Sequence, residues 1–121
     1  MLDLMAGKRR ISPVVNLAAA NVAVVIVVIS NFAGMVGVKT MKIKRIKIRN
    51  NNGGNTWVHI GNGIFGAWTD RIPALYSISN TTDDYDEDDL PQVESILTLA
   101  AYPEAVGGGS FDVQIEVEDV G

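Results

Sequence analysis

A strictly alternating stretch near the end of the chain reads Phe111-Asp112-Val113-Gln114-Ile115-Glu116-Val117-Glu118. Apolar and polar residues take turns in it, and successive side chains of a β-strand point to opposite faces of a sheet. The stretch therefore predicts a strand with one face in a hydrophobic core and the other in water. We expect its partner in residues 95–101, because the connector Gly107-Gly108-Gly109-Ser110 between them suits a hairpin.

Residues 93–101, just before that connector, fit two structures. The glycine-rich connector and the alternating stretch after it favour a strand in a local hairpin. A helix is the alternative, with Pro91 in its first turn and Asp89 and Gln92 placed as a capping box. The apolar residues at helical spacing are Val93, Ile96, Leu97, Ala100 and Ala101.

A second alternating stretch, residues 39–49, changes phase once. Met41 and Ile43 precede the change at Lys44-Arg45, and Ile46 and Ile48 follow it. One extra residue at that point, a β-bulge, would keep all four apolar side chains on one face. Turn-forming residues occupy 50–55, and residues 56–60 again have strand composition. We expect residues 39–49 and 56–60 to form a hairpin.

An uncharged run covers residues 11–38. Its densest part, Val22 to Ile29, contains seven β-branched residues in eight, which is typical of a strand. Because the run does not alternate, we expect a strand that is covered on both sides, in part by another chain. The length of the run also permits an alternative, a membrane anchor over residues 14–38.

The composition suits one domain. The chain has 121 residues, of which 47% are hydrophobic, and it has no cysteine. A core of this size needs no disulfide, and the missing thiols exclude cysteine nucleophiles and cysteine metal sites. We expect an all-β protein, with a single small β-sandwich or barrel-like domain at residues 14–121 and an extended N-terminal arm at residues 1–13.

Charge is divided unevenly along the chain. Residues 1–50 contain nine bases and one acid, a net charge of +8, whereas residues 51–121 contain one base and thirteen acids, a net charge of −12. The halves should attract each other, within one chain or between copies, over distances shorter than the screening length of roughly 8–10 Å. We expect the basic residues Lys42, Lys44, Lys47 and Arg49 to lie near Asp112, Glu116 and Glu118.

Candidates for catalysis and cofactor binding each have a simpler interpretation. The stretch Gly61-Asn62-Gly63-Ile64-Phe65-Gly66 has the spacing of a dinucleotide fingerprint, but Pro73 interrupts the helix that the fingerprint requires.

His59, the one histidine, shares a strand face with Trp57, which is typical of a cross-strand contact. Ser110 lacks the glycine two places later that a nucleophile elbow needs. We expect no enzyme, no cofactor, no metal centre and no small-molecule substrate.

Acidic residues are densest at positions 83–89. Asp84, Asp86 and Asp88 have the spacing that opens a calcium loop, but Asp89 stands where that loop needs glycine and Ser95 where it needs glutamate. We expect a solvated acidic loop, with loose Ca²⁺ binding or docking to a basic neighbour as alternatives.

The basic stretch at residues 42–49 supports another alternative, a nucleic-acid-binding β domain. Its lysines and arginines could follow phosphates while Trp57 stacks on a base. The strongly acidic second half opposes this interpretation, because it would repel a polyanion unless it faced away.

The whole profile resembles the small decoration, or cement, proteins of tailed-bacteriophage heads. The arm Met1–Pro13, the β-rich body from Val22 onward and the connector into Phe111 carry this resemblance. It implies a structural virion protein that binds in multiple copies to a viral capsid lattice, with coat protein subunits and copies of itself as partners. The expected contact residues are Leu2, Leu4, Met5, Lys8, Arg9, Arg10, Val25, Val27, Asp83, Asp84, Asp86 and Asp88.

Overall fold

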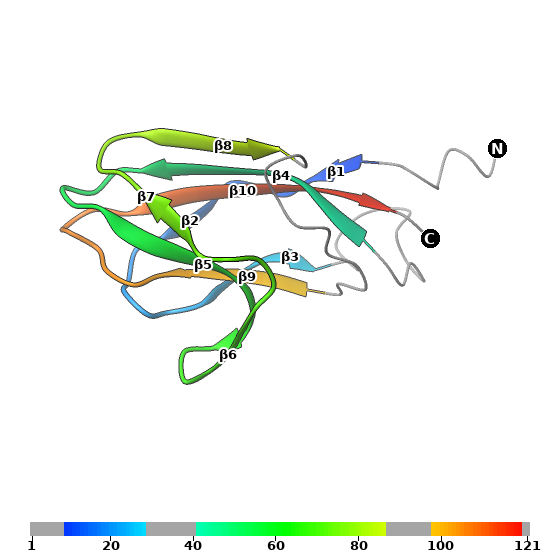
Figure 1. Ribbon diagram of the computed structural model, residues 1–121, viewed down its shortest axis with the longest axis horizontal. Coiled ribbons are helices and arrows are strands. Elements are labelled where there is room, and N and C mark those ends of the chain that lie inside the picture. Colours follow the sequence, from blue (N-terminus) through cyan, green and yellow to red (C-terminus); the bar gives the residue numbers. More distant parts are fainter. Residues whose placement is uncertain (1–8, 29–40, 87–97, 120–121) are drawn as a thin grey trace.

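The strands form two antiparallel sheets that pack face to face (Figure 1). The computed structural model describes residues 9–28, 41–86 and 98–119. Sheet A contains β1 (Arg9–Ile11), β2 (Val15–Leu17), β4 (Met41–Asn50), β8 (Thr82–Asp86) and β10 (Phe111–Asp119). Sheet B contains β3 (Val24–Val28), β5 (Thr56–Ile64), β6 (Ala67–Asp70), β7 (Leu75–Ser77) and β9 (Thr98–Pro103). The predicted all-β sandwich is confirmed.

The order of the strands is that of a jelly roll. In sheet A, β1 and β2 pair with successive parts of β10, which is followed by β4 and β8. In sheet B, β3, β9 and β5 are neighbours, and β7 and β6 pair with successive parts of β5. The chain changes sheet at every connection from β2 to β5 and again from β7 to β10. Counting β1 and β2 as one interrupted strand, and β6 and β7 as another, gives four strands in each sheet, eight in all, as in a jelly roll.

The core lies between the sheets, and β10 contributes its centre. Phe111, Val113, Ile115 and Val117 are fully buried, and the polar residues between them are partly exposed. The predicted alternation is therefore confirmed. Burying a side chain of this size stabilises a fold by roughly 1.5–3 kcal/mol. These side chains share one cluster with Leu17, Ile46, Ile48, Val58, Ile60 and Leu99.

The predicted β-bulge is present in β4. Arg45 lies opposite Glu116 and Ile43 lies opposite Val117, so Lys44 is the extra residue between them. The bulge restores the apolar face, because Ile43, Ile46 and Ile48 are all buried. Residues 41–50 thus form one long strand in spite of the phase change.

The predicted hairpin between residues 39–49 and 56–60 is wrong. β4 pairs with β8 and β10, whereas β5 lies in the other sheet. Residues 51–55 cross between the sheets, and buried amides hold this crossing. Asn50 donates from Nδ2 to the carbonyls of Gly54 and Ser77, and its Oδ1 accepts from the backbone and the side chain of Asn52. These bonds satisfy polar groups that a buried crossing would otherwise leave unpaired.

The second predicted hairpin is also wrong, although its first member is a strand. Residues 98–103 form β9, which pairs with β3 and β5 instead of β10. The connector 104–110 crosses between the sheets and packs against the other crossing, where a Cβ on Gly109 would lie 2.2 Å from the carbonyl oxygen of Asn51. The choice between strand and helix for residues 93–97 lies outside the described residues.

The densest apolar run forms β3, an edge strand of sheet B that pairs with β9. Ile26 and Val27 are both buried, because the register shifts between Val25 and Val27, whereas Val25 is 55% exposed. Among the described residues, Val25 of β3 is thus largely exposed, and its cover by another chain stays a prediction. Among the described residues no helix is long and apolar enough to cross a membrane. Part of the proposed anchor at 14–38 is instead β2 and β3, and residues 29–38 lie outside the described part.

The boundary between arm and domain needs correction. Arg9 to Ile11 form β1 and pair with residues 116–118 of β10. Ser12 extends this connection, since its backbone N–H donates to the Ile115 carbonyl and its Oγ accepts from the Ile115 N–H. Residues 9–11, which fall within the predicted arm at residues 1–13, therefore belong to sheet A. The expected contact residues Leu2, Leu4, Met5 and Lys8 lie outside the described residues.

Candidate functional site

The opposite charges of the two halves meet within sheet A. Arg49 lies opposite Asp112, Arg45 opposite Glu116, and Lys42 opposite Glu118. Lys44 Nζ lies 3.5 Å from Glu118 Oε1. The predicted proximity of the basic and acidic strands is confirmed, and the contact is within one chain.

The other side of β4 is also acidic. The acidic loop predicted at residues 83–89 is wrong for residues 83–86, which lie in the strand β8, and residues 87–89 are outside the described part. Asp84 lies opposite Lys47 and Asp86 opposite Arg45. Arg45 donates from Nε and Nη2 to the carboxylate of Asp84, and this hydrogen bond holds the pKa of Asp84 below its usual value. β4 therefore lies between two strands whose acidic side chains compensate part of its positive charge. Asp88 lies outside the described residues.

Aromatic side chains line the outer face of sheet B. Trp57 and His59 share this face, as expected from their spacing in β5. Tyr76 of β7 lies opposite Trp57, with ring centroids 4.9 Å apart, and Tyr102 of β9 lies opposite His59 and stacks on it with centroids 4.6 Å apart.

A hairpin of β5 and β6 projects beyond the sandwich and brings two more rings to this face (Figure 1). Phe65 at its tip and Trp68 in β6 both make edge contacts with Tyr102. Glycines permit the hairpin, because a Cβ on Gly61 would lie 2.0 Å from the Thr69 carbonyl oxygen and Gly63 has a φ of +109°. The apparent dinucleotide fingerprint is therefore a hairpin in sheet B.

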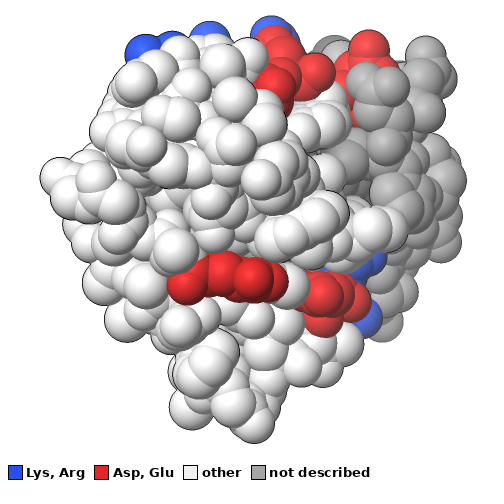
Figure 2. Space-filling model, turned by 60° about the vertical axis from the view of Figure 1, so that its left-hand side comes forward, with Lys and Arg blue, Asp and Glu red and all other residues white. Residues whose placement is uncertain are grey.

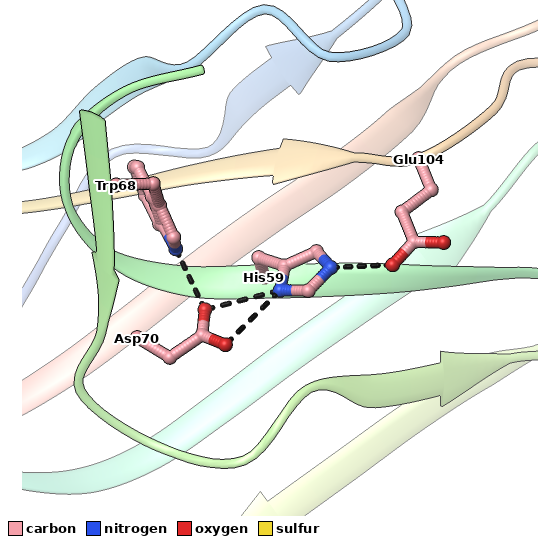
Figure 3. A network of polar contacts seen from close by, with 4 residues as sticks. All are labelled: His59, Trp68, Asp70 and Glu104. Atoms are coloured by element: carbon pink, nitrogen blue, oxygen red, sulfur yellow. Dashed lines mark hydrogen bonds and ion pairs between the residues drawn. The ribbon is translucent and has the colours of Figure 1, made fainter. Parts of the chain in front are cut away.

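Two carboxylates hold the imidazole of His59 (Figure 3). Nδ1 lies 3.0 Å from Asp70 Oδ1, and Nε2 lies 2.6 Å from Glu104 Oε2. Trp68 donates from Nε1 to the same Asp70 oxygen at 2.6 Å. Asp70 ends β6 and Glu104 directly follows β9, so both segments reach the His59 side chain of β5.

The protonated form of His59 fits this arrangement. Burial lowers the pKa of the imidazole, but the hydrogen bonds with Glu104 and Asp70 outweigh it and raise the pKa above 6.5. An imidazolium has two N–H donors and can serve both carboxylates at once, whereas the neutral ring has only one. Burial and the nearby negative charges also raise the pKa of Tyr102.

The geometry suits recognition at a surface. Both ring nitrogens of His59 are engaged, and within the described ranges no three metal-ligating side chains gather to hold an ion. A hollow on the outer face of sheet A, lined by Ile11, Arg45, Lys47, Gln114 and Glu116, has a volume of about 80 Å³. This volume is smaller than that of a usual ligand pocket, which measures about 300–1,000 Å³.

A second surface, the apolar edge, lies along the side of the sandwich formed by β1, β2 and β3. β2 and β3 contact each other there, although they belong to different sheets. Three aliphatic residues in β3 or beside β2 and β3 are each more than half exposed: Val14, Val22 and Val25.

The expected contact residues are scattered by the fold. Val25 belongs to the apolar edge, but Val27 faces the core and is fully buried, so its side chain is not available to a partner. Arg9 and Arg10 lie in β1, and Asp83 lies in β8 opposite the buried Ile48. The residues around His59 that the sequence did not predict are Trp68, Asp70, Tyr102 and Glu104. They come from other segments, and no local spacing links them to β5.

Comparison with known proteins does not assign the chain to a family. No family model matches it, and no curated protein matches it.

Proposed function

We propose that this protein is a structural protein of a virion that binds in multiple copies to a viral capsid lattice and stabilises it. The apolar edge carries the proposal. Its exposed valines, in β3 and beside β2, favour a surface that a partner covers. The partners are coat protein subunits and neighbouring copies of the same chain.

The two edges of the sandwich carry different side chains, acidic at one and aliphatic at the other, as this proposal requires. β8, at the opposite edge of sheet A, carries Asp83, Asp84 and Asp86. Acidic side chains on an edge strand discourage pairing with other chains. β3 contains only valine and isoleucine and has no such protection. Association is therefore favoured at β3 and opposed at β8.

The architecture is compatible with this role. Jelly rolls occur in viral capsid domains, although they also occur in lectins and cupins, so the fold alone assigns no function. A small apolar surface binds weakly by itself. Repetition around a symmetric lattice converts weak contacts into firm attachment through avidity.

Capsids prepared without this protein provide the test. We expect the double variant Val14→Ser with Val25→Ser to bind them about tenfold more weakly than the unmodified protein. Ile78→Ser is the matched control, because Ile78 is an exposed aliphatic residue in the connection between β7 and β8, away from the apolar edge. It should bind normally. Normal binding by the double variant would exclude the apolar edge as the contact.

The stabilising role has its own readout. Capsids saturated with the protein should release their genome at a higher temperature than bare capsids. Equal release temperatures would mean that the protein attaches to the capsid without stabilising it, and would overturn that part of the proposal.

A further inference from the structure

The outer face of sheet B carries a row of aromatic and acidic side chains that the proposed assembly surface does not use. Tyr76, Trp57, His59 and Tyr102 occupy paired positions on β7, β5 and β9. Glu104 donates its backbone N–H to the Trp57 carbonyl, so this acid lies beside both Trp57 and His59. Figure 2 shows a largely uncharged side of the molecule with acidic atoms gathered in a band and a few basic atoms at one end of that band.

We infer that this face binds a neutral saccharide, with Trp57, Tyr76 and Phe65 offering apolar ring surfaces and Glu104 and Asp70 accepting hydrogen bonds from sugar hydroxyls. Phe65 is 58% exposed, and Trp57 and Tyr76 are each nearly half exposed. A pyranose has a flat apolar face of C–H groups and a rim of hydroxyl donors. Rings beside fixed carboxylates complement both features.

The charge of this face favours some classes of ligand over others. Two carboxylates repel phosphorylated or other anionic ligands, which excludes nucleic acid from this face. A cationic peptide would gain from the acids alone and would not need the rings. Pairing with His59 compensates part of the carboxylate charge and makes the face more suitable for an uncharged ligand. Exposed rings next to partly compensated acids therefore favour a sugar.

The acceptors are held in place before any ligand arrives. Asp70 is bonded to both Trp68 and His59, and Glu104 is bonded to His59 through Oε2. Within the described chain, Oε1 of Glu104 has no other hydrogen-bond partner. Because these side chains are already ordered, binding would lose little conformational entropy.

Native gels cast with neutral polysaccharides test the inference. The panel is laminarin, xylan, galactomannan and dextran, and at least one of them should retard the protein. The two tryptophans of the chain give separate indole N–H signals in a ¹H–¹⁵N spectrum. Both signals should shift when an oligosaccharide of the retarding polymer is added. The inference is overturned if none of the four polymers retards the protein.

Variants of the protein distinguish binding of a saccharide from binding of another kind of ligand at this face. Trp57→Ala and Glu104→Gln should each weaken saccharide binding by about tenfold. Val25→Ser, on the apolar edge, is the folded control and should retain it. Because Trp57→Ala should still occupy capsids, failure of this inference and failure of the proposed function are distinguishable. Retardation by poly-L-lysine alone, lost in Glu104→Gln and kept in Trp57→Ala, would instead assign a docking surface for a cationic peptide and overturn the inference.

Discussion

Nε2 of His59 lies 2.6 Å from Oε2 of Glu104, a contact that ties the middle of β5 to the residue after β9. The opposite ring nitrogen faces Asp70, so the imidazole stands between two carboxylates. This relationship links the stability of sheet B to pH, and it positions the acids on the candidate recognition face.

Stability should decrease as the pH rises above neutrality. The pKa of His59 is raised in the folded protein above its value of 6.5 in the unfolded chain. The folded state therefore binds the proton more tightly. This contribution is fully present below pH 6.5 and is lost as the pH rises through the folded pKa. Urea unfolding of the unmodified protein between pH 5 and 9 should show the loss, and His59→Gln should not.

An NMR titration measures the pKa of His59 directly. The chain has one histidine, so its ring signal needs no assignment. We expect a midpoint above 6.5, and a lower midpoint in Glu104→Gln. A midpoint at or below 6.5 in the unmodified protein would contradict the prediction.

Asn52→Ala should destabilise the protein by about 1–3 kcal/mol. Asn52 is buried, donates from Nδ2 to Asn50 Oδ1 and the Ser110 carbonyl, and accepts from the Gly109 N–H. Its loss removes the bonds to Ser110 and Gly109 that join the two crossings and leaves the Gly109 N–H without this acceptor. Asn55→Ala is the control, because exposed Asn55 accepts only one described bond, from Ser79, and should cost less. Equal urea midpoints for the two variants would refute this ranking.

Gly61→Ala should displace the β5–β6 hairpin. A Cβ at this position would lie 2.0 Å from the Thr69 carbonyl oxygen and 3.0 Å from Asp70 Cα, so the backbone of β6 must move. We expect a cost of about 1–3 kcal/mol and a shift of the Trp68 indole signal. Gly54→Ala, where nothing lies within 4 Å of the added carbon, should be close to neutral. An unchanged Trp68 signal in Gly61→Ala would count against the close contact.

Lysine at two neighbouring positions of β3 should have opposite effects. Val27 is fully buried, so Val27→Lys places a charge in the core and should unfold the protein at ambient temperature. Val25 is 55% exposed, so Val25→Lys should keep the fold while reducing capsid occupancy. Circular dichroism and capsid co-sedimentation separate the two results. A folded Val27→Lys monomer would mean that β3 is not part of the core.

Local patterns in the sequence determined that residues 41–50 and 111–119 form strands and which of their side chains face inward. Alternation in residues 111–118 predicted the buried face of β10, and the phase change at Lys44 predicted the bulge of β4. Charge segregation predicted that β4 and the acidic end of the chain lie together. Each of these properties depends on the twofold period of a strand or on simple Coulomb attraction, which a single chain displays directly.

Only the tertiary structure decided how the strands pair and which side chains meet at His59. Residues 39–49 and 56–60 have the composition of a hairpin, yet the buried amides of Asn50 and Asn52 support a crossing to the other sheet. Asp70 and Glu104 lie 11 and 45 residues from His59 and reach it through separate neighbours of β5. Pairing between distant strands follows from burial of one shared core, which no short stretch of the chain encodes by itself.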